Sequence, residues 1–234
     1  GVPASQCSLA KLRQRVPSSS IWTVDLAFVL REFGVRYRYL TTTIGVDPSH
    51  REKAFYRLTL DHDASRVNSL FERARECNIA IESKSLSPSE LRSICSGAHT
   101  RGGNLIIGLV DRRHLYHPAV KTNSEALEGT DLNFGARLGS SIGNILTAFS
   151  SIATGAFETG FSTGGYLGHY ILITSYNAQL QGYYILDPAG ADDYTFIPDE
   201  NLNAARKSHG TDEDLLVIPL DQPPLAVIGN TYTV

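Results

Sequence analysis

Two residues in the last third of the sequence, His169 and Asp187, have the types and spacing of a catalytic pair. His169 opens an apolar run typical of a strand and Asp187 closes the next such run, with a polar turn at 177–181 between them. In an antiparallel pair the start of one strand lies beside the end of the other, so we expect the two side chains to approach each other closely. A carboxylate that holds an imidazole in one tautomer supplies two members of a nucleophilic triad. The alternative is a histidine at a strand end beside an Asp-Pro turn, with no catalytic role.

The third member of such a triad, the nucleophile, is harder to find among the three cysteines. Cys7 follows Ser5, which can cap a helix and lower the thiol pKa, but the surrounding segment has only a thin apolar stripe. Cys77 and Cys95 fall on apolar faces of expected helices, which indicates core positions. The sequence therefore supplies a base and an orienting carboxylate without a convincing attacking group.

A run of three acidic residues, Asp212, Glu213 and Asp214, is a candidate site for a metal and a nucleotide. Carboxylates bind Mg²⁺, which in turn holds nucleotide phosphates. The alternative is a solvated turn, because Mg²⁺ sites usually take carboxylates from separate elements. No Walker motif and no dinucleotide-binding fingerprint accompanies the run.

The segments that must position these residues alternate between helical and extended patterns. Helices are expected where an apolar stripe or a capping signal is present, at 22–33, 67–77, 87–97 and 198–210. Strands are expected at 35–39, 79–81, 105–110, 170–176, 182–186 and 215–220. This order predicts an α+β fold with helices packed on a mostly antiparallel sheet.

The composition is that of an ordinary globular protein. The 234 residues are 42% hydrophobic and 19% charged with a net charge of -3, which excludes wholesale disorder and argues against a nucleic-acid partner. Residues 118–167 form a Gly- and Ser-rich insertion, and half of the residues in 138–157 are Gly, Ser, Thr or Asn, so no membrane span is expected. We expect one domain over 1–220, a loose tail at 221–234, and a cytoplasmic location with reduced cysteines.

Short motifs distributed over about 18–220, apart from the insertion, carry a resemblance to a known family. They are Ser20-Ile21-Trp22-Thr23-Val24-Asp25-Leu26-Ala27, Phe33-Gly34-Val35, Gly45-Val46, Phe55-Tyr56, Arg66-Val67, Leu70-Phe71, Gly168-His169-Tyr170, Asp187-Pro188-Ala189 and the block from Ala204 to Asp214. Together they resemble the plant-type guanylyl cyclase family. The resemblance implies conversion of GTP to cyclic GMP and pyrophosphate with Mg²⁺ or Mn²⁺. It also makes Arg206 and Lys207 candidates for the cation that stabilises the negative charge that develops on the phosphates during the reaction.

The family pattern is also similar to papain-like peptidases of the bacteriocin-processing type, whose histidine and aspartate correspond to His169 and Asp187. In that pattern the nucleophilic cysteine lies on a helix upstream of the block that begins at Ser20, and Cys7 aligns with the linker after the helix. The resemblance implies a papain-like α+β fold from which the N-terminal catalytic helix is absent. Because the chain opens with Gly1 and contains no methionine, we expect the natural start to lie upstream.

Three functions therefore remain open. The first is a guanylyl cyclase that acts on GTP. The second is a relic of a papain-like thiol hydrolase, with His169 and Asp187 but no nucleophile, that binds an extended peptide or a partner protein. The third is a non-enzymatic interaction module whose contact lies in the insertion at 118–167.

Overall fold

The computed structural model of the chain describes residues 14–15, 20–52, 54–57, 59–96, 103–116, 166–189 and 194–221. Cys7, nearly all of the expected insertion and the tail beyond 221 lie outside these residues. The helices and strands are α2 (Thr23–Glu32), β1 (Arg38–Thr41), η2 (Pro48–Glu52), α3 (Ala54–Arg57), α4 (Leu60–Ala74), β2 (Ile81–Ser83), α5 (Pro88–Cys95), β3 (Asn104–Asp111), α6 (Arg112–Leu115), β4 (Gly168–Asn177), β5 (Gly182–Leu186), β6 (Tyr194–Pro198), α9 (Asp199–Arg206) and β7 (Leu215–Pro219).

The strands form one seven-stranded sheet in the order β2-β1-β7-β3-β4-β5-β6. The pair β1–β2 is parallel and the other neighbouring pairs are antiparallel. This confirms the α+β class and the mostly antiparallel sheet. The expected hairpin is also present, because β4 pairs with β5 in antiparallel register.

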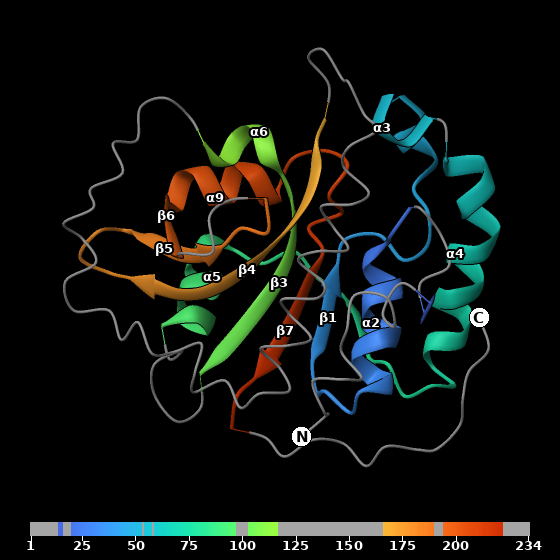
Figure 1. Cartoon of the computed structure of the whole chain (residues 1–234), viewed down its shortest axis with the longest axis horizontal. Helices are drawn as coiled ribbons and strands as arrows, with labels where there is room; N and C mark the ends of the chain where they lie inside the picture. The colour runs from blue at the N-terminus through green and yellow to red at the C-terminus, as the bar shows by residue number, and fades with distance from the viewer. Residues whose placement is uncertain are drawn as a thin grey trace.

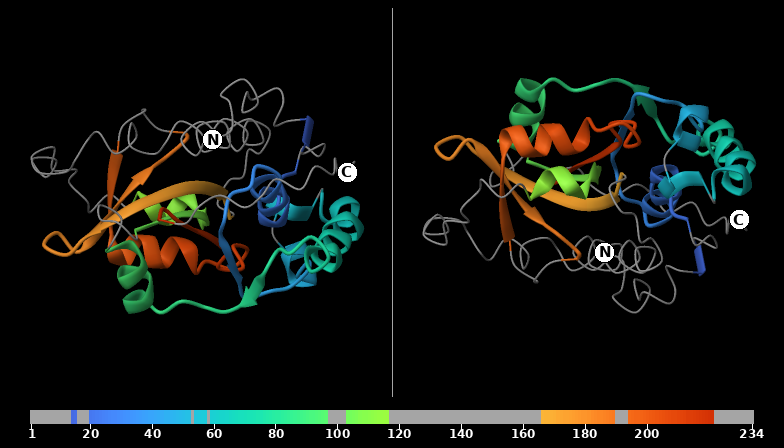
Figure 2. Two further views of the ribbon diagram at one scale, coloured as in Figure 1. Left: turned by 90° about the horizontal axis from the view of Figure 1, so that it is seen from below. Right: turned by 90° about the horizontal axis from the view of Figure 1, so that it is seen from above.

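Both faces of the sheet are covered by helices. Leu105 and Ile107 of β3 pack into one apolar cluster with residues of α2 and α4, whereas Ile106 and Val110 pack into a second cluster with residues of α5, α6 and α9. Alternate residues of a strand point to opposite faces, so a continuous apolar run is what a strand buried on both sides requires. Figure 1 shows α2 beside β1 and α4 on the outer side of α2, and both views in Figure 2 show α9 on the other side of the curved sheet.

Helix ends follow local hydrogen-bonding signals. The carboxylate of Asp25 accepts a hydrogen bond from the amide of Trp22 at 2.9 Å, so α2 is capped by a residue of its own first turn. Gly34, with φ of 70°, follows the end of the same helix in the left-handed conformation that glycine adopts readily. The capping box of α5 is confirmed, since Ser87 accepts from the Glu90 amide at 3.2 Å and Glu90 accepts from the Ser87 amide at 2.8 Å.

Some elements differ from the sequence-based expectation. Strand β1 starts at Arg38, because the preceding residues approach α2, where the Tyr37 hydroxyl donates to the Ala27 carbonyl at 2.5 Å. Strand β6 and the short helix α6 were not predicted, since each has five residues or fewer and shows no clear periodicity. Among the described residues, no helix combines the length and apolarity needed to cross a membrane.

Candidate functional site

The pair expected from the hairpin is formed. His169 lies at the start of β4 and Asp187 directly follows β5, and Nε2 of His169 is 2.6 Å from Oδ1 of Asp187. Both side chains are only 1% exposed. Antiparallel pairing of the two strands places these ends together, which confirms the predicted approach.

The carboxylate of Asp187 is held by further donors. It accepts hydrogen bonds from the Tyr116 hydroxyl and, at 2.8 Å, from the Ala189 amide, while the guanidinium of Arg112 lies 4.0 Å away. Burial raises the pKa of Asp187, but the hydrogen bonds from His169 and Tyr116 outweigh it and the net pKa lies below its ordinary value. Asp187 is therefore ionised and can hold the imidazole in one orientation. Sequence reasoning missed Tyr116, which follows the unpredicted helix α6 and carries no motif.

The described cysteines do not supply a nucleophile. Cys77 and Cys95 are both free thiols buried in the two apolar clusters, which confirms their expected core positions. Burial raises the pKa of Cys95 to about 12, so its thiol is protonated at neutral pH. The described part of the chain therefore contains a histidine–carboxylate pair but no activated thiol.

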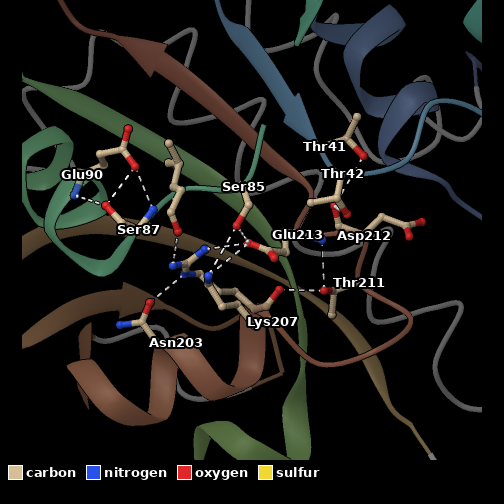
Figure 3. Close-up of polar contacts among 12 residues, drawn as sticks. Thr41, Thr42, Ser85, Ser87, Glu90, Asn203, Lys207, Thr211, Asp212 and Glu213 are labelled. Atoms are coloured by element: carbon tan, nitrogen blue, oxygen red, sulfur yellow. Dashed lines mark hydrogen bonds and ion pairs between the residues drawn. The ribbon is translucent and has the colours of Figure 1, made fainter. Parts of the chain in front are cut away.

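The three acidic residues that precede β7 have three different surroundings. Glu213 lies among cations and a hydroxyl, since its Oε2 is 3.2 Å from Arg206, 3.8 Å from Lys207 and 2.7 Å from Ser85. Figure 3 shows Glu213 with Ser85 and Lys207 on one side of the loop and Asp212 with Thr42 on the other. The run therefore does not bring three carboxylates to one point.

Asp212 is fixed through its backbone. Its carbonyl accepts hydrogen bonds from the amide and the hydroxyl of Thr42 at 2.7 and 2.9 Å, which ties the loop to the end of β1. Asp212 and Glu213 both have positive φ, 50° and 51°, so two successive residues adopt the left-handed conformation. The side chain of Asp212 is 14% exposed and its Oδ1 lies 3.4 Å from Nε2 of His50.

Asp214 is buried beneath the loop. Its Oδ2 accepts a hydrogen bond from the Tyr39 hydroxyl at 3.2 Å, and its backbone carbonyl accepts from the Leu109 amide at 3.0 Å. Burial, together with the charge of Asp212, raises the pKa of Asp214 to about 7. Asp214 thus joins the loop to β1 and β3. Unlike Asp212, whose side chain is partly exposed, Asp214 is buried.

The two cations of the 204–214 block also differ. Arg206 has a fully buried side chain that donates to the Leu86 carbonyl at 2.7 Å and to Asn203 at 2.9 Å, in addition to its ion pair with Glu213. The Lys207 side chain is 39% exposed. Arg206 therefore holds the loop in place, and Lys207 is the cation of this block that a solvent-borne anion can reach.

The part of the block before Asp212 lies close to the His169–Asp187 pair. The Ser208 hydroxyl donates to Asp111 at 3.0 Å, and Asp111 pairs in register with Gly168, the neighbour of His169. The structure thus connects two candidate sites through one strand, β3. Sequence spacing alone gave no sign of this connection.

A group of possible metal ligands borders Asp212. Asp47, His50 and His209 each offer one ligand atom, and these atoms lie within 4.8 Å of one another. Sequence reasoning missed all three, because the first two lie in a short polar segment far from His209 in the chain. The only local signal was the Asp47-Pro48 turn.

Comparisons with known proteins identify the family. A family model described as "Guanylylate cyclase" matches residues 4–218. "Guanylyl cyclase 1" of Arabidopsis thaliana is 32% identical over 217 residues, which are 93% of this chain and 66% of that protein, so the chain spans less than two thirds of its relative. The search of solved structures found no match, and the papain-like fold stays a prediction. The chain belongs to the guanylylate cyclase family.

Proposed function

We propose that the chain converts GTP to cyclic GMP and pyrophosphate. In this reaction the ribose 3′-hydroxyl loses its proton to solvent and its oxygen bonds to the α-phosphorus, the bond from that phosphorus to the bridging oxygen breaks, and pyrophosphate leaves. The observation that carries the proposal is the family match over residues 4–218. The name of the Arabidopsis thaliana relative agrees with it.

We place the nucleotide phosphates across the loop of the 204–214 block, with Asp212 on one side of the loop and Lys207 on the other. Mg²⁺ is commonly bound by one or two carboxylates together with substrate phosphates, and the accessible carboxylate of Asp212 suits that arrangement for Mg²⁺ or Mn²⁺. When bound, such an ion neutralises phosphate charge. Lys207 would contact the phosphates directly, while the ion pair of Arg206 with Glu213 keeps the loop in position.

Direct detection of the product tests this proposal. The purified chain is incubated with GTP and Mg²⁺ or Mn²⁺, and cyclic GMP is measured by mass spectrometry. We expect product from the wild type, much less from Asp212→Asn, and a wild-type amount from the control Asp221→Asn, which changes an exposed carboxylate after β7. Asparagine tolerates the left-handed conformation at position 212. No product from the wild type with either metal would overturn the proposal.

A second candidate function rests on the 2.6 Å contact between His169 and Asp187. A thiol-hydrolase relic with this pair would bind an extended peptide or a partner protein. A ligand that binds only the folded state raises the midpoint of thermal unfolding. Stabilisation by a library of extended peptides, without stabilisation by GTP and Mg²⁺, would favour this candidate over the cyclase.

The proposed setting is the cytoplasm. Cys77 and Cys95 are free in the structure, and free buried thiols are typical of a reducing compartment. Localisation of a tagged full-length protein by fluorescence microscopy tests this expectation, and a secreted protein would contradict it.

A further inference from the structure

Side chains from two distant segments meet beside the loop that follows α9. Asp47 directly precedes η2, His50 lies within η2, and His209 follows α9. One possible ligand atom from each residue lies within 4.8 Å of the other two. Zinc–nitrogen and zinc–oxygen bonds are about 2.0–2.2 Å long, so two ligand atoms on one ion lie about 3–3.5 Å apart. Small side-chain rotations therefore suffice to bring all three atoms onto one ion.

The buried imidazole of His50 points to a ligand. Its side chain is 0% exposed, yet neither ring nitrogen has a hydrogen-bond partner among the described residues. The ring stacks on Tyr56 with a centroid distance of 4.8 Å and an interplanar angle of 16°, which fixes the plane in which the nitrogens lie. Buried polar atoms in folded proteins are nearly always satisfied. A bound cation would satisfy one of these two nitrogens.

Two neighbouring groups are placed to orient the histidines. Oδ1 of Asp212 lies 3.4 Å from Nε2 of His50, and the Ser49 hydroxyl lies 3.1 Å from Nε2 of His209. Histidines that bind metal commonly present their second ring nitrogen to a carboxylate or another polar group. This arrangement leaves Nδ1 of each histidine for the ion.

The third ligand is held in position and the cluster has an entry path. The Ser49 amide donates to Oδ1 of Asp47 at 2.8 Å, which fixes the carboxylate at the start of η2. A carboxylate binds a metal ion in its deprotonated form. His209 is exposed, so an ion can enter from solvent on that side.

We propose that Asp47, His50 and His209 bind one divalent transition-metal ion of the zinc type, with Asp212 and Ser49 orienting the two imidazoles. Two imidazole nitrogens and one carboxylate oxygen suit Zn²⁺ better than Mg²⁺, which prefers oxygen ligands. Three protein ligands leave a fourth position for water, as in catalytic rather than structural zinc sites. The site does not depend on GTP turnover.

Zinc titration of the full chain tests the site. The chain is freed of metal with a chelator and titrated with ZnCl₂ in a calorimeter without GTP, and Co²⁺ is used in parallel for its visible absorption. We expect one tight equivalent for the wild type. His209→Gln removes an exposed ligand, so folding is preserved, and affinity falls by at least about tenfold. His62→Gln, which changes an 87% exposed histidine on α4, is the matched control and leaves affinity unchanged.

The outcomes separate this site from the cyclase proposal. Equal zinc affinity in His209→Gln and His62→Gln, or no zinc binding by the wild type, would overturn the site whether or not cyclic GMP is formed. If the carboxylate of Asp212 orients His50, Asp212→Asn weakens zinc binding by about tenfold, because loss of a residue that orients a metal ligand lowers metal affinity by about that factor. Unchanged zinc affinity in Asp212→Asn would overturn the orienting role.

Discussion

Nε2 of His169 and Oδ1 of Asp187 lie 2.6 Å apart in a setting where both side chains are 1% exposed. The contact joins the first residues of β4 to the residue after β5 and so closes the open end of the hairpin. An ionised carboxylate at such a buried position needs its donors, because loss of one leaves charge in a medium of low polarity. The contact thus has consequences for stability that do not depend on catalysis.

Asp187→Asn is expected to lower the free energy of unfolding by about 3 kcal/mol at neutral pH, because it removes the buried carboxylate that accepts hydrogen bonds from His169 and Tyr116. Urea denaturation followed by circular dichroism measures the change. The control is Asp61→Asn, whose carboxylate is 74% exposed, with an expected change below about 0.5 kcal/mol. Equal effects of the two substitutions would contradict the prediction.

The same carboxylate predicts an acid dependence of stability. The pKa of Asp187 in the folded chain lies below the ordinary value of 3.8, so its contribution is present above that value and is lost as the pH falls through the folded pKa. Between about pH 5 and pH 3 the wild type should therefore lose more stability than Asp187→Asn. The free energy of unfolding of both proteins is measured by urea denaturation at each pH. If the two free energies fell in parallel with pH, Asp187 would not be the titrating group and the prediction would be wrong.

Adjacent cations of the 204–214 block should differ sharply in their effect on stability. Arg206→Met removes a fully buried guanidinium from Glu213 and the Leu86 carbonyl and should cost about 3 kcal/mol or more. Lys207→Met changes a side chain that is 39% exposed and should cost less than about 0.5 kcal/mol. Thermal and urea unfolding measure both, and a large loss in Lys207→Met alone would reverse the assigned roles.

Local and regular features of the fold were predictable from the sequence. The apolar run of β3, the hairpin β4–β5 and the capping box at Ser87 follow from short-range patterns, and the contact of His169 with Asp187 follows from the hairpin. The elements that were missed are short and take their conformation from tertiary contacts. Strand β6, for example, has five residues and pairs along β5.

The environment of the acidic run could not be predicted in the same way. Three consecutive carboxylates look equivalent in sequence, yet Asp214 is buried against Tyr39, Glu213 faces Arg206, and Asp212 faces His50. Two successive residues of the run, Asp212 and Glu213, adopt the left-handed conformation, which turns their side chains apart. No pattern of residue types in the sequence predicts this conformation. The partner His50 is supplied by a distant segment, so spacing within the block contained no information about it.

The most direct test of a nucleotide site at the 204–214 block compares cyclic GMP formation by two variants of the purified chain with that of the wild type. Cyclic GMP and pyrophosphate are quantified from GTP with Mg²⁺ or Mn²⁺ for the wild type, Asp212→Asn and His169→Gln, after circular dichroism confirms that each is folded. We expect equal amounts of the two products from the wild type, a loss of both in Asp212→Asn, and their retention in His169→Gln. Loss in His169→Gln with retention in Asp212→Asn would contradict a nucleotide site at the 204–214 block, and no product from any of the three would contradict the cyclase function itself.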